Sequence, residues 1–172
     1  MKIVLAFAVA FVLLPQVASA GPLDKARDGN LQCYGPNVVR KTCNSLAGYT
    51  FENGKILNQA EVLVSQTPPL VMKTVSPVEI RGDAVCGPLR KKDIESAKIL
   101  VRGQVLNEAD AAPIKAQLVS AFGARLEKEV CTAYRKQGDT LVTEVTIAGL
   151  DHSELKETVI WVAPSEGYRV SP

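Results

Sequence analysis

One stretch decides the fold, and it reads Leu31-Gln-Cys33-Tyr-Gly-Pro-Asn-Val-Val-Arg-Lys-Thr-Cys43-Asn-Ser-Leu-Ala-Gly-Tyr-Thr-Phe-Glu-Asn53-Gly54-Lys55. Two cysteines ten residues apart bracket a Gly-Pro-Asn turn, so the spacing predicts a short loop closed by a disulfide. Asn53-Gly54 is the dipeptide that type I′ turns favour, and it predicts a hairpin between the runs 46–51 and 56–64. The stretch carries no nucleophile, metal or phosphate-binding motif, and we expect it to anchor the first strand pair of a small domain.

The first twenty residues have the three parts of a secretory signal. Lys2 provides the positive charge, Ile3–Pro15 is an almost unbroken apolar run, and Ala18-Ser19-Ala20 is a small-residue cleavage site. The apolar run is shorter than the ~20 residues needed to span a bilayer. We therefore expect a signal peptide over residues 1–20 and one exported α+β domain over residues 21–172.

Two absences indicate where the exported chain resides. No cysteine follows the cleavage site to accept a bacterial lipid anchor, and the sequence contains no Asn-x-Ser/Thr glycosylation sequon. Both fit a bacterial protein that is periplasmic or secreted and does not span a membrane. The whole chain carries a formal net charge of +2, and removal of Lys2 with the signal leaves +1. A nearly neutral chain offers no electrostatic basis for binding nucleic acid.

All four cysteines lie after the signal and predict two disulfides. Three pairings are possible, and we favour Cys33–Cys43 with Cys86–Cys131, because the first closes a loop that the turn residues already bend. A zinc site or a redox site would need closer pairs such as Cys-x-x-Cys. Only one histidine is present to join such a site. We therefore expect the cysteines to be structural, with no metal and no cofactor bound.

The rest of the chain reads as short strands around one clear helix. Pro77 is expected to end one strand and separate it from the next. Asp110 is a plausible N-cap, and an apolar residue recurs every four positions after it, at Ile114, Leu118, Phe122 and Leu126. The expected strands are 46–51, 56–64, 70–75, 78–81, 98–106, 130–135, 141–147 and 158–163. The pattern predicts an α+β fold, with a mainly antiparallel sheet, one principal helix packed on it, and two disulfides.

No residue stands out as catalytic. Asp151-His152-Ser153 contains the residue types of a hydrolase triad, but sequence neighbours usually point in different directions, and the run reads as a polar turn. The carboxylates at positions 61, 79, 83, 127, 129, 144 and 157 are scattered over strands and turns and predict no acid–base pair. The basic residues Arg90-Lys91-Lys92, supported by Arg40-Lys41 and Arg135-Lys136, read as solvated loops.

Aromatic residues are the best candidates for binding. Trp161 is the largest side chain, and with Tyr168 and Tyr34 it would make an exposed aromatic platform. The alternative is that Trp161 packs in the core, since an alternating strand puts it on one face with Val159 and Ala163. The core interpretation is the simpler of the two.

Two functions of different class remain. The first is a non-catalytic domain, expected to be monomeric, that binds a protein, an envelope component or a small ligand. The second is a small hydrolase of the cell envelope without a recognisable motif, and the absence of every strong catalytic motif favours the first. The order of signal, early cysteine pair, central Val-Cys-Gly-Pro and closing Trp-Val-Ala-Pro-x-x-Gly-Tyr resembles small exported bacterial proteins of unassigned function. That resemblance implies no activity.

Overall fold

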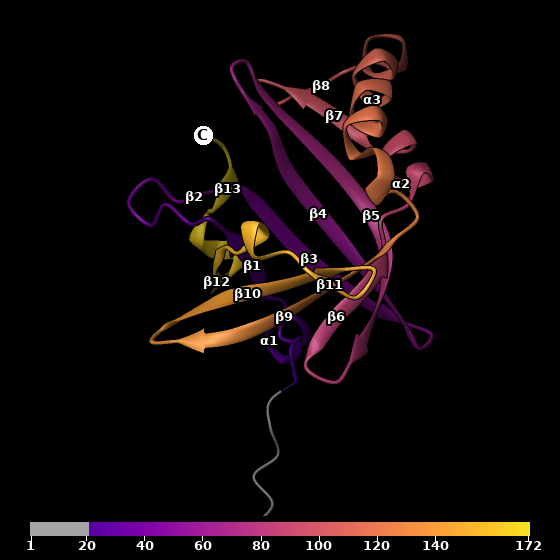
Figure 1. Cartoon of the computed structure of the whole chain (residues 1–172). Coiled ribbons are helices and arrows are strands. Elements are labelled where there is room, and N and C mark those ends of the chain that lie inside the picture. The colour runs from indigo at the N-terminus through magenta and orange to yellow at the C-terminus, as the bar shows by residue number, and fades with distance from the viewer. Residues whose placement is uncertain (1–20) are drawn as a thin grey trace, which may run out of the picture.

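The computed structural model describes residues 21–172, and eight antiparallel strands in it form a closed barrel (Figure 1). The strands follow one another around the barrel in the order β4, β3, β1, β12, β10, β9, β6 and β5, and pairing of β5 with β4 closes the ring. Their bounds are β1 Leu31–Tyr34, β3 Ser45–Glu52, β4 Lys55–Gln66, β5 Pro69–Arg81, β6 Ala84–Pro88, β9 Glu129–Gln137, β10 Thr140–Ile147 and β12 Thr158–Val162. The predicted signal peptide lies outside the described residues.

Shorter elements surround the barrel. Helix α1 (Asp24–Arg27) precedes β1, whereas α2 (Lys91–Glu95) and α3 (Glu108–Phe122) follow β6. Strands β7 (Lys98–Val101) and β8 (Gln104–Val105) extend the sheet from β5, and β2 (Thr42–Cys43) pairs with β13 (Arg169–Val170). The remaining elements are β11 (Leu150–Asp151) and the 3₁₀ turns η1 (Gly123–Arg125), η2 (Ser153–Leu155) and η3 (Pro164–Glu166).

The predicted Asn53-Gly54 hairpin is confirmed. β3 and β4 pair from Glu52↔Lys55 to Ser45↔Val62. Asn53 has φ 51° and Gly54 has φ 73°, as a type I′ turn requires at both central positions. The twist of that turn matches the twist of the flanking strands, so the hairpin enters the barrel without splaying.

The predicted α+β fold is wrong, because the strands form a closed barrel instead of an open sheet with a helix on one face. β4 and β5 are the longest strands, and they pair from Gln66↔Pro69 to Ile56↔Val78. Neighbouring strands are rotated relative to one another, and over eight strands this twist allows the last strand to meet the first. No local sequence pattern distinguishes a closed barrel from an open sheet, since the strands of both alternate between residues on one face and residues on the other.

The expectation that Pro77 ends a strand is also wrong. β5 runs unbroken from Pro69 to Arg81 and pairs on one side with β4. On its other side it pairs with β7 at residues 70–73 and with β6 at residues 79–81. Pro77 lies between those two partners, where its missing N–H need not interrupt a ladder.

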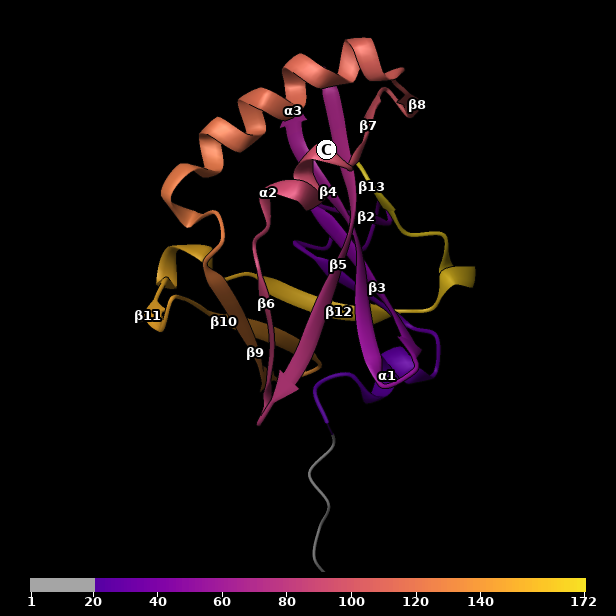
Figure 2. The ribbon, with the colours of Figure 1, turned by 90° about the vertical axis from the view of Figure 1, so that its right-hand side faces the viewer.

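Helices lie near both ends of the barrel (Figure 2). At one end, Leu23 and Ala26 of α1 pack beneath the inner side chains of Val85, Phe51 and Trp161. At the other end, β4 and β5 continue past the barrel and carry α2 and α3, which surround a second cluster of buried residues, Met72, Ile94, Ala97, Ile99 and Ala111. Each end of the barrel thus has a hydrophobic cluster that includes residues of a helix.

Helix α3 begins earlier than predicted. Its N-cap is Asn107, whose Oδ1 accepts a hydrogen bond from the backbone N–H of Asp110 at 3.0 Å. Asp110, the expected N-cap, is therefore inside the first turn. The predicted apolar stripe is present, because Ile114, Leu118 and Phe122 all pack against the cluster around Met72.

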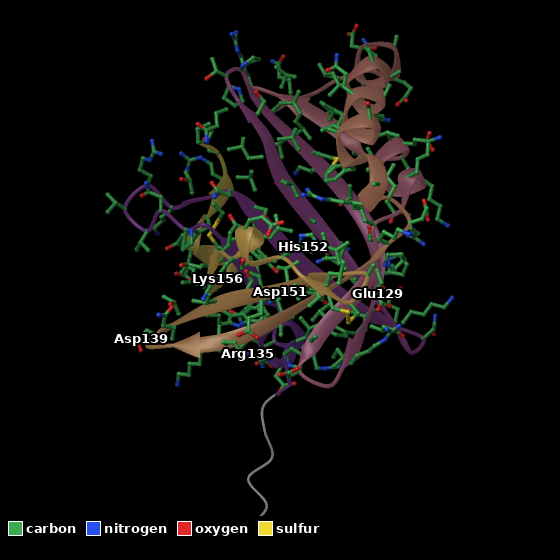
Figure 3. The ribbon with its side chains drawn as sticks, viewed as in Figure 1. Glu129, Arg135, Asp139, Asp151, His152 and Lys156 are labelled. Atoms are coloured by element: carbon green, nitrogen blue, oxygen red, sulfur yellow. A yellow bond between two sulfur atoms is a disulfide. The ribbon has the colours of Figure 1, made fainter. Side chains whose placement is uncertain are left out.

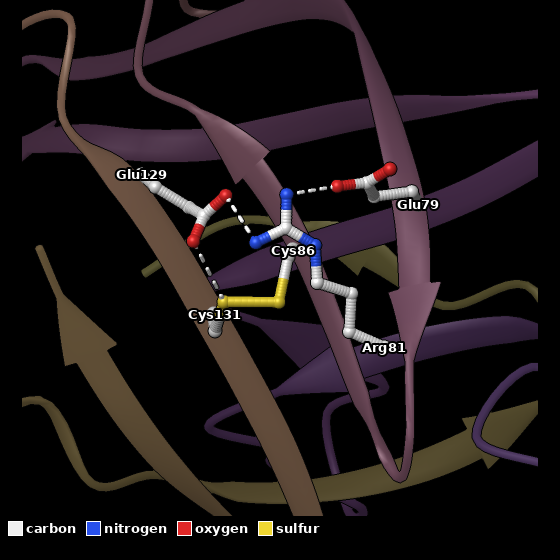
Figure 4. The surroundings of a disulfide bond; sticks show 5 residues. All are labelled: Glu79, Arg81, Cys86, Glu129 and Cys131. Carbon is white, nitrogen blue, oxygen red and sulfur yellow. Dashed lines mark hydrogen bonds and ion pairs between the residues drawn. A yellow bond between two sulfur atoms is a disulfide. The ribbon is translucent and has the colours of Figure 1, made fainter. Parts of the chain in front are cut away.

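Two disulfides are present, Cys33–Cys43 and Cys86–Cys131, the pairing favoured from the spacing. Cys86 and Cys131 lie directly opposite each other on β6 and β9, and Arg81 bridges Glu79 and Glu129 beside them (Figure 4). Two disulfides indicate an oxidising environment. Among residues 21–172, no helix has the length and the apolar character needed to cross a membrane.

Candidate functional site

A cavity of about 330 Å³ lies inside the barrel. Its wall is made by inner-facing side chains of β1, β3, β4, β5, β6 and β9, and by residues of α2 and Phe122 at the end of α3. The cavity therefore lies between the strands of the barrel and the α2 and α3 segment.

Small side chains create this space. Ala47, Ala60 and Thr74 stand directly opposite one another on the neighbouring strands β3, β4 and β5. On β6, a Cβ atom at Gly87 would lie 2.9 Å from the carbonyl oxygen of Pro77, so a side chain there would displace backbone. Ser45 on β3 and Ser76 on β5 are further small residues in the lining of the cavity.

A polar cluster of three tyrosines and one glutamine lies toward the α1 end of the cavity. The Gln32 side chain is 0% exposed, and its Oε1 accepts hydrogen bonds from the hydroxyls of Tyr49 at 2.7 Å and Tyr34 at 3.0 Å. The hydroxyl of Tyr134 lies 3.3 Å from the same oxygen and 2.6 Å from the Tyr34 hydroxyl. Gln32, Tyr34 and Tyr49 lie on the paired strands β1 and β3, and Tyr134 of β9 joins them because the barrel closes.

The three tyrosines are neutral at ordinary pH. Burial raises the pKa of Tyr34 and Tyr49 well above the usual tyrosine value, and the charge of the neighbouring Tyr134 phenolate would raise both further. Burial also raises the pKa of Tyr134, although its hydrogen-bonding interactions with Tyr34, Tyr49 and Gln32 partly oppose that shift. The cluster consequently offers hydrogen bonds without charge.

The amide nitrogen of Gln32 has no hydrogen-bond partner. Among the described residues, Nε2 of Gln32 is the one buried side-chain nitrogen or oxygen that lacks such a partner. An unpaired buried donor costs about 1–3 kcal/mol. Its own amide oxygen is bonded to two tyrosines that line the cavity, so the unpaired N–H groups belong to the same polar cluster.

An ion pair is built into the wall at the α2 end. Asp93 accepts hydrogen bonds from Arg90 Nε at 2.8 Å and Nη2 at 2.7 Å, and from the Ser76 hydroxyl at 2.7 Å. The two charged side chains are 20% and 10% exposed. Because the guanidinium and the carboxylate neutralise each other, this end of the cavity also carries no net charge.

The three aromatic residues proposed for binding from the sequence do not form one platform. Tyr34 faces the barrel interior, and Trp161 stands opposite Gln32 on β12, so it faces inward too. Tyr168 lies outside, packed against the cluster of Cys33, Cys43 and Val162. The structure therefore places two of the three on the inner face and separates the third from them.

His152, the best catalytic candidate from the sequence, lies outside the barrel in a separate surface hollow that Asp151, Ser153 and Lys156 also line (Figure 3). Its Nδ1 is 2.7 Å from Glu154 Oε1, and the hydrogen bond to His152 lowers the pKa of Glu154. Among the described side chains, no Ser or Thr hydroxyl is hydrogen-bonded to the imidazole. The pair resembles a surface contact more than a nucleophile with its base.

The carboxylates considered for acid–base chemistry are engaged on the outer surface. Glu61 pairs with Lys73, and Asp83 and Glu144 both pair with Arg135. Arg135 lowers the pKa of Asp83 through a hydrogen bond, which holds that carboxylate ionised. Glu61, Asp83 and Glu144 therefore form surface ion pairs.

Gln32, Tyr49 and Tyr134 were not identified from the sequence. Tyr49 and Tyr134 lie on expected strands, and Gln32 lies on β1, which pairs with one of them. On each strand, side chains alternate between the two faces, so the face of each residue follows from those of its neighbours. The sequence does not show that the inner faces of these three strands all point into the same barrel interior. One sequence signal could have identified Tyr49: the residues that share its face of β3, Ser45 and Ala47, are small.

Within residues 21–172, no group of three or more histidine, cysteine, aspartate or glutamate side chains is placed to hold a metal ion. No protein-family model, curated protein or solved structure matches this chain.

Proposed function

We propose that this protein is an exported binding protein, periplasmic or secreted after removal of residues 1–20, that holds one small and largely apolar molecule inside its barrel. The observation that carries the proposal is the cavity of about 330 Å³ inside the barrel, bordered by Ala47, Ala60 and Thr74 where a filled core would have larger side chains. The two disulfides support a working environment that is oxidising.

The size and lining of the cavity agree with binding. Barrels of eight strands have interiors that are either just filled by side chains or able to hold one small ligand. Ligand sites span about 300–1,000 Å³ and are mostly apolar with a few polar groups. This cavity lies at the lower end of that range, and Val62, Met72, Val78 and Phe122 supply apolar surface.

The polar groups in the wall support binding rather than catalysis. The described cavity wall contains no histidine and no cysteine, and its tyrosines are neutral. Its one carboxylate, Asp93, is bonded to Arg90 and Ser76. A ligand would thus meet hydrogen-bonding groups and no activated nucleophile.

A matched pair of variants tests the proposal. Ala60→Leu adds bulk inside the cavity, whereas Gln59→Leu adds the same side chain at the next position, on the exposed outer face of β4. The fluorescence of N-phenylnaphthylamine, an uncharged apolar probe, is titrated with each protein. We expect saturable binding at one site, weakened about tenfold by Ala60→Leu and unchanged by Gln59→Leu.

Three outcomes would overturn the proposal. The probe could fail to bind saturably, both variants could weaken it equally, or Gln59→Leu alone could do so. Urea unfolding of both variants checks that each one is folded at the temperature of the titration.

A further inference from the structure

We infer that the loop between Cys33 and Cys43 docks this protein on an anionic lipid surface. In this arrangement Val38 and Val39 enter the outer part of the bilayer, and the cations beside them bind the lipid headgroups. The inference concerns a different part of the molecule from the cavity, and it does not depend on the proposed function.

The tip of this loop is an exposed apolar pair. Val38 is 62% exposed and Val39 is 94% exposed, and the two are neighbours in the turn over residues 38–41. Figure 1 shows the loop projecting from the barrel beside β2. Other exposed large apolar residues of the described chain, such as Val105 and Leu150, stand singly on separate strands. Single residues of this kind are ordinary on a protein surface, whereas contiguous apolar surface marks an interaction site.

The loop is held in this shape by bonds at its base. The Cys33–Cys43 disulfide closes it, and two backbone hydrogen bonds join Asn37 to Thr42, at 2.7 Å and 3.1 Å. Across the turn, Oδ1 of Asn37 accepts a hydrogen bond from the backbone N–H of Arg40 at 3.0 Å. Because the turn is fixed in this way, the two valines point outward before any surface is met, and docking costs little ordering entropy.

Three exposed cations lie beside the valines. Arg40 and Lys41 follow them in the chain, and the backbone N–H of Arg169 donates to the carbonyl oxygen of Lys41 at 3.1 Å. Within residues 21–172, none of the three side chains forms an ion pair with a carboxylate. Glu166 is beside the loop, but it accepts the Lys41 ammonium on its backbone oxygen at 2.9 Å, and its carboxylate binds the N–H of Ala163. The loop therefore carries an excess of positive charge.

An apolar tip with cations around it matches the interface of an anionic bilayer. There, apolar side chains enter the boundary of the acyl chains while basic side chains remain among the headgroups. Each basic residue near such a surface strengthens binding about fivefold. The valine side chains have no hydrogen-bonding group and stand on a projecting tip, which suits a fluid apolar phase better than a shaped protein pocket. The formal charge of the whole chain is only +2, so the attraction is local and turns the loop toward the lipid.

Sedimentation of the exported protein with lipid vesicles tests the inference. With vesicles of phosphatidylcholine and phosphatidylglycerol in equal parts we expect saturable binding, at least about tenfold tighter than with phosphatidylcholine alone. Replacing both Val38 and Val39 by serine should weaken binding about tenfold, because it removes the inserted apolar surface. Val105→Ser, which changes a valine of 61% exposure on β8, should leave binding unchanged.

A second pair of variants tests the contribution of charge. Arg40→Gln combined with Arg169→Gln should weaken binding to the mixed vesicles about twentyfold. Lys98→Gln combined with Lys136→Gln removes the same net charge at exposed positions on β7 and β9. At physiological salt, charges far from the bilayer are screened, so this control should change binding by about twofold or less. Equal losses from the two pairs would overturn the inference, because they would show that net charge alone sets the affinity.

A reporter at the tip decides whether the loop enters the lipid. Brominated phosphatidylcholine in the mixed vesicles should quench the tryptophan added by Val39→Trp and leave the one added by Val105→Trp unquenched. The native Trp161 faces the barrel interior and gives the same background in both. The inference is overturned if the native protein does not bind the mixed vesicles, if it binds both compositions equally, or if the tryptophan at position 39 is not quenched. None of these outcomes affects the cavity proposal, whose titration contains no lipid.

Discussion

At the scale of residues, Gln32 is the most informative position in the chain. A fully buried glutamine is uncommon, and it usually has all of its polar atoms paired. Here the oxygen is paired with tyrosine hydroxyls and the nitrogen is not. The unpaired amide nitrogen therefore costs stability that the paired oxygen does not.

The buried tyrosines predict a loss of stability at high pH. Their pKa values in the folded state lie above the unfolded value of about 10, because burial penalises the phenolate. Their neutral form stabilises the fold fully below pH about 10, and this contribution falls as the pH rises toward the folded-state pKa, by about 1.4 kcal/mol per pH unit for each tyrosine. Above pH about 10 we therefore expect the unfolding free energy to fall more steeply for the native chain than for Tyr49→Phe.

Urea unfolding at a series of pH values measures the two slopes, and equal slopes would contradict this account. The near-ultraviolet absorbance of tyrosinate provides an independent check. In the folded protein it should rise at a higher pH than in the protein unfolded in urea.

At the scale of elements, α3 shows how local chemistry and packing combine. Asn107 caps its first turn, and the stripe of Ile114, Leu118 and Phe122 packs on the cluster around Met72. Lys115 is also buried, because its Nζ donates to the carbonyl oxygen of Glu95 at 2.9 Å and pairs with Glu108. The helix is held by its cap, its stripe and a cation that reaches α2.

The position of the cap can be tested by two substitutions. Asn107→Ala should lower the free energy of unfolding by about 1 kcal/mol, since it leaves a backbone N–H of the first turn unpaired. Asp110→Ala, the control, keeps the backbone N–H that the cap pairs. It removes a first-turn acidic residue and the exposed hydrogen bond that its Oδ2 accepts from Nδ2 of Asn107 at 2.8 Å, and it should cost about 0.5 kcal/mol or less. Urea unfolding of the whole chain measures both. A larger loss from Asp110→Ala would show that the cap is misassigned.

For the whole molecule, the two disulfides constrain the chain to different degrees. Cys33–Cys43 closes a loop of 10 residues beside β1, whereas Cys86–Cys131 spans 45 residues and fastens β6 to β9 in the wall of the barrel. The second joins segments that lie on either side of α2, β7, β8 and α3. It therefore restricts the unfolded chain more than the first.

Replacing both Cys86 and Cys131 by alanine should lower stability by about 4 kcal/mol, the loop entropy that a closed loop of this length predicts. The measurement is urea unfolding of the oxidised double variant. Reduction of the native chain with a thiol breaks both disulfides without any substitution, so the loss that it causes should be at least as large as that of the double variant. A loss of less than about 1 kcal/mol would show that the barrel does not depend on this link.

The sequence by itself determined the local features. The Asn53-Gly54 hairpin, the apolar stripe of α3 and the strands of the last third of the chain were all predictable, because they depend on turn residues and on periodicity within a few residues. The spacing of the cysteines also favoured the pairing that the structure contains.

Closure of the sheet, and therefore the cavity inside it, could be seen in the tertiary structure alone. Closure depends on the pairing of β4 with β5 and on the twist summed over eight strands, neither of which leaves a mark in a short window of sequence. Gln32 and Tyr49 belong to the paired strands β1 and β3, whereas Tyr134 belongs to β9, about 100 residues later. They become one cluster around a cavity because closure turns the inner faces of those strands toward one another.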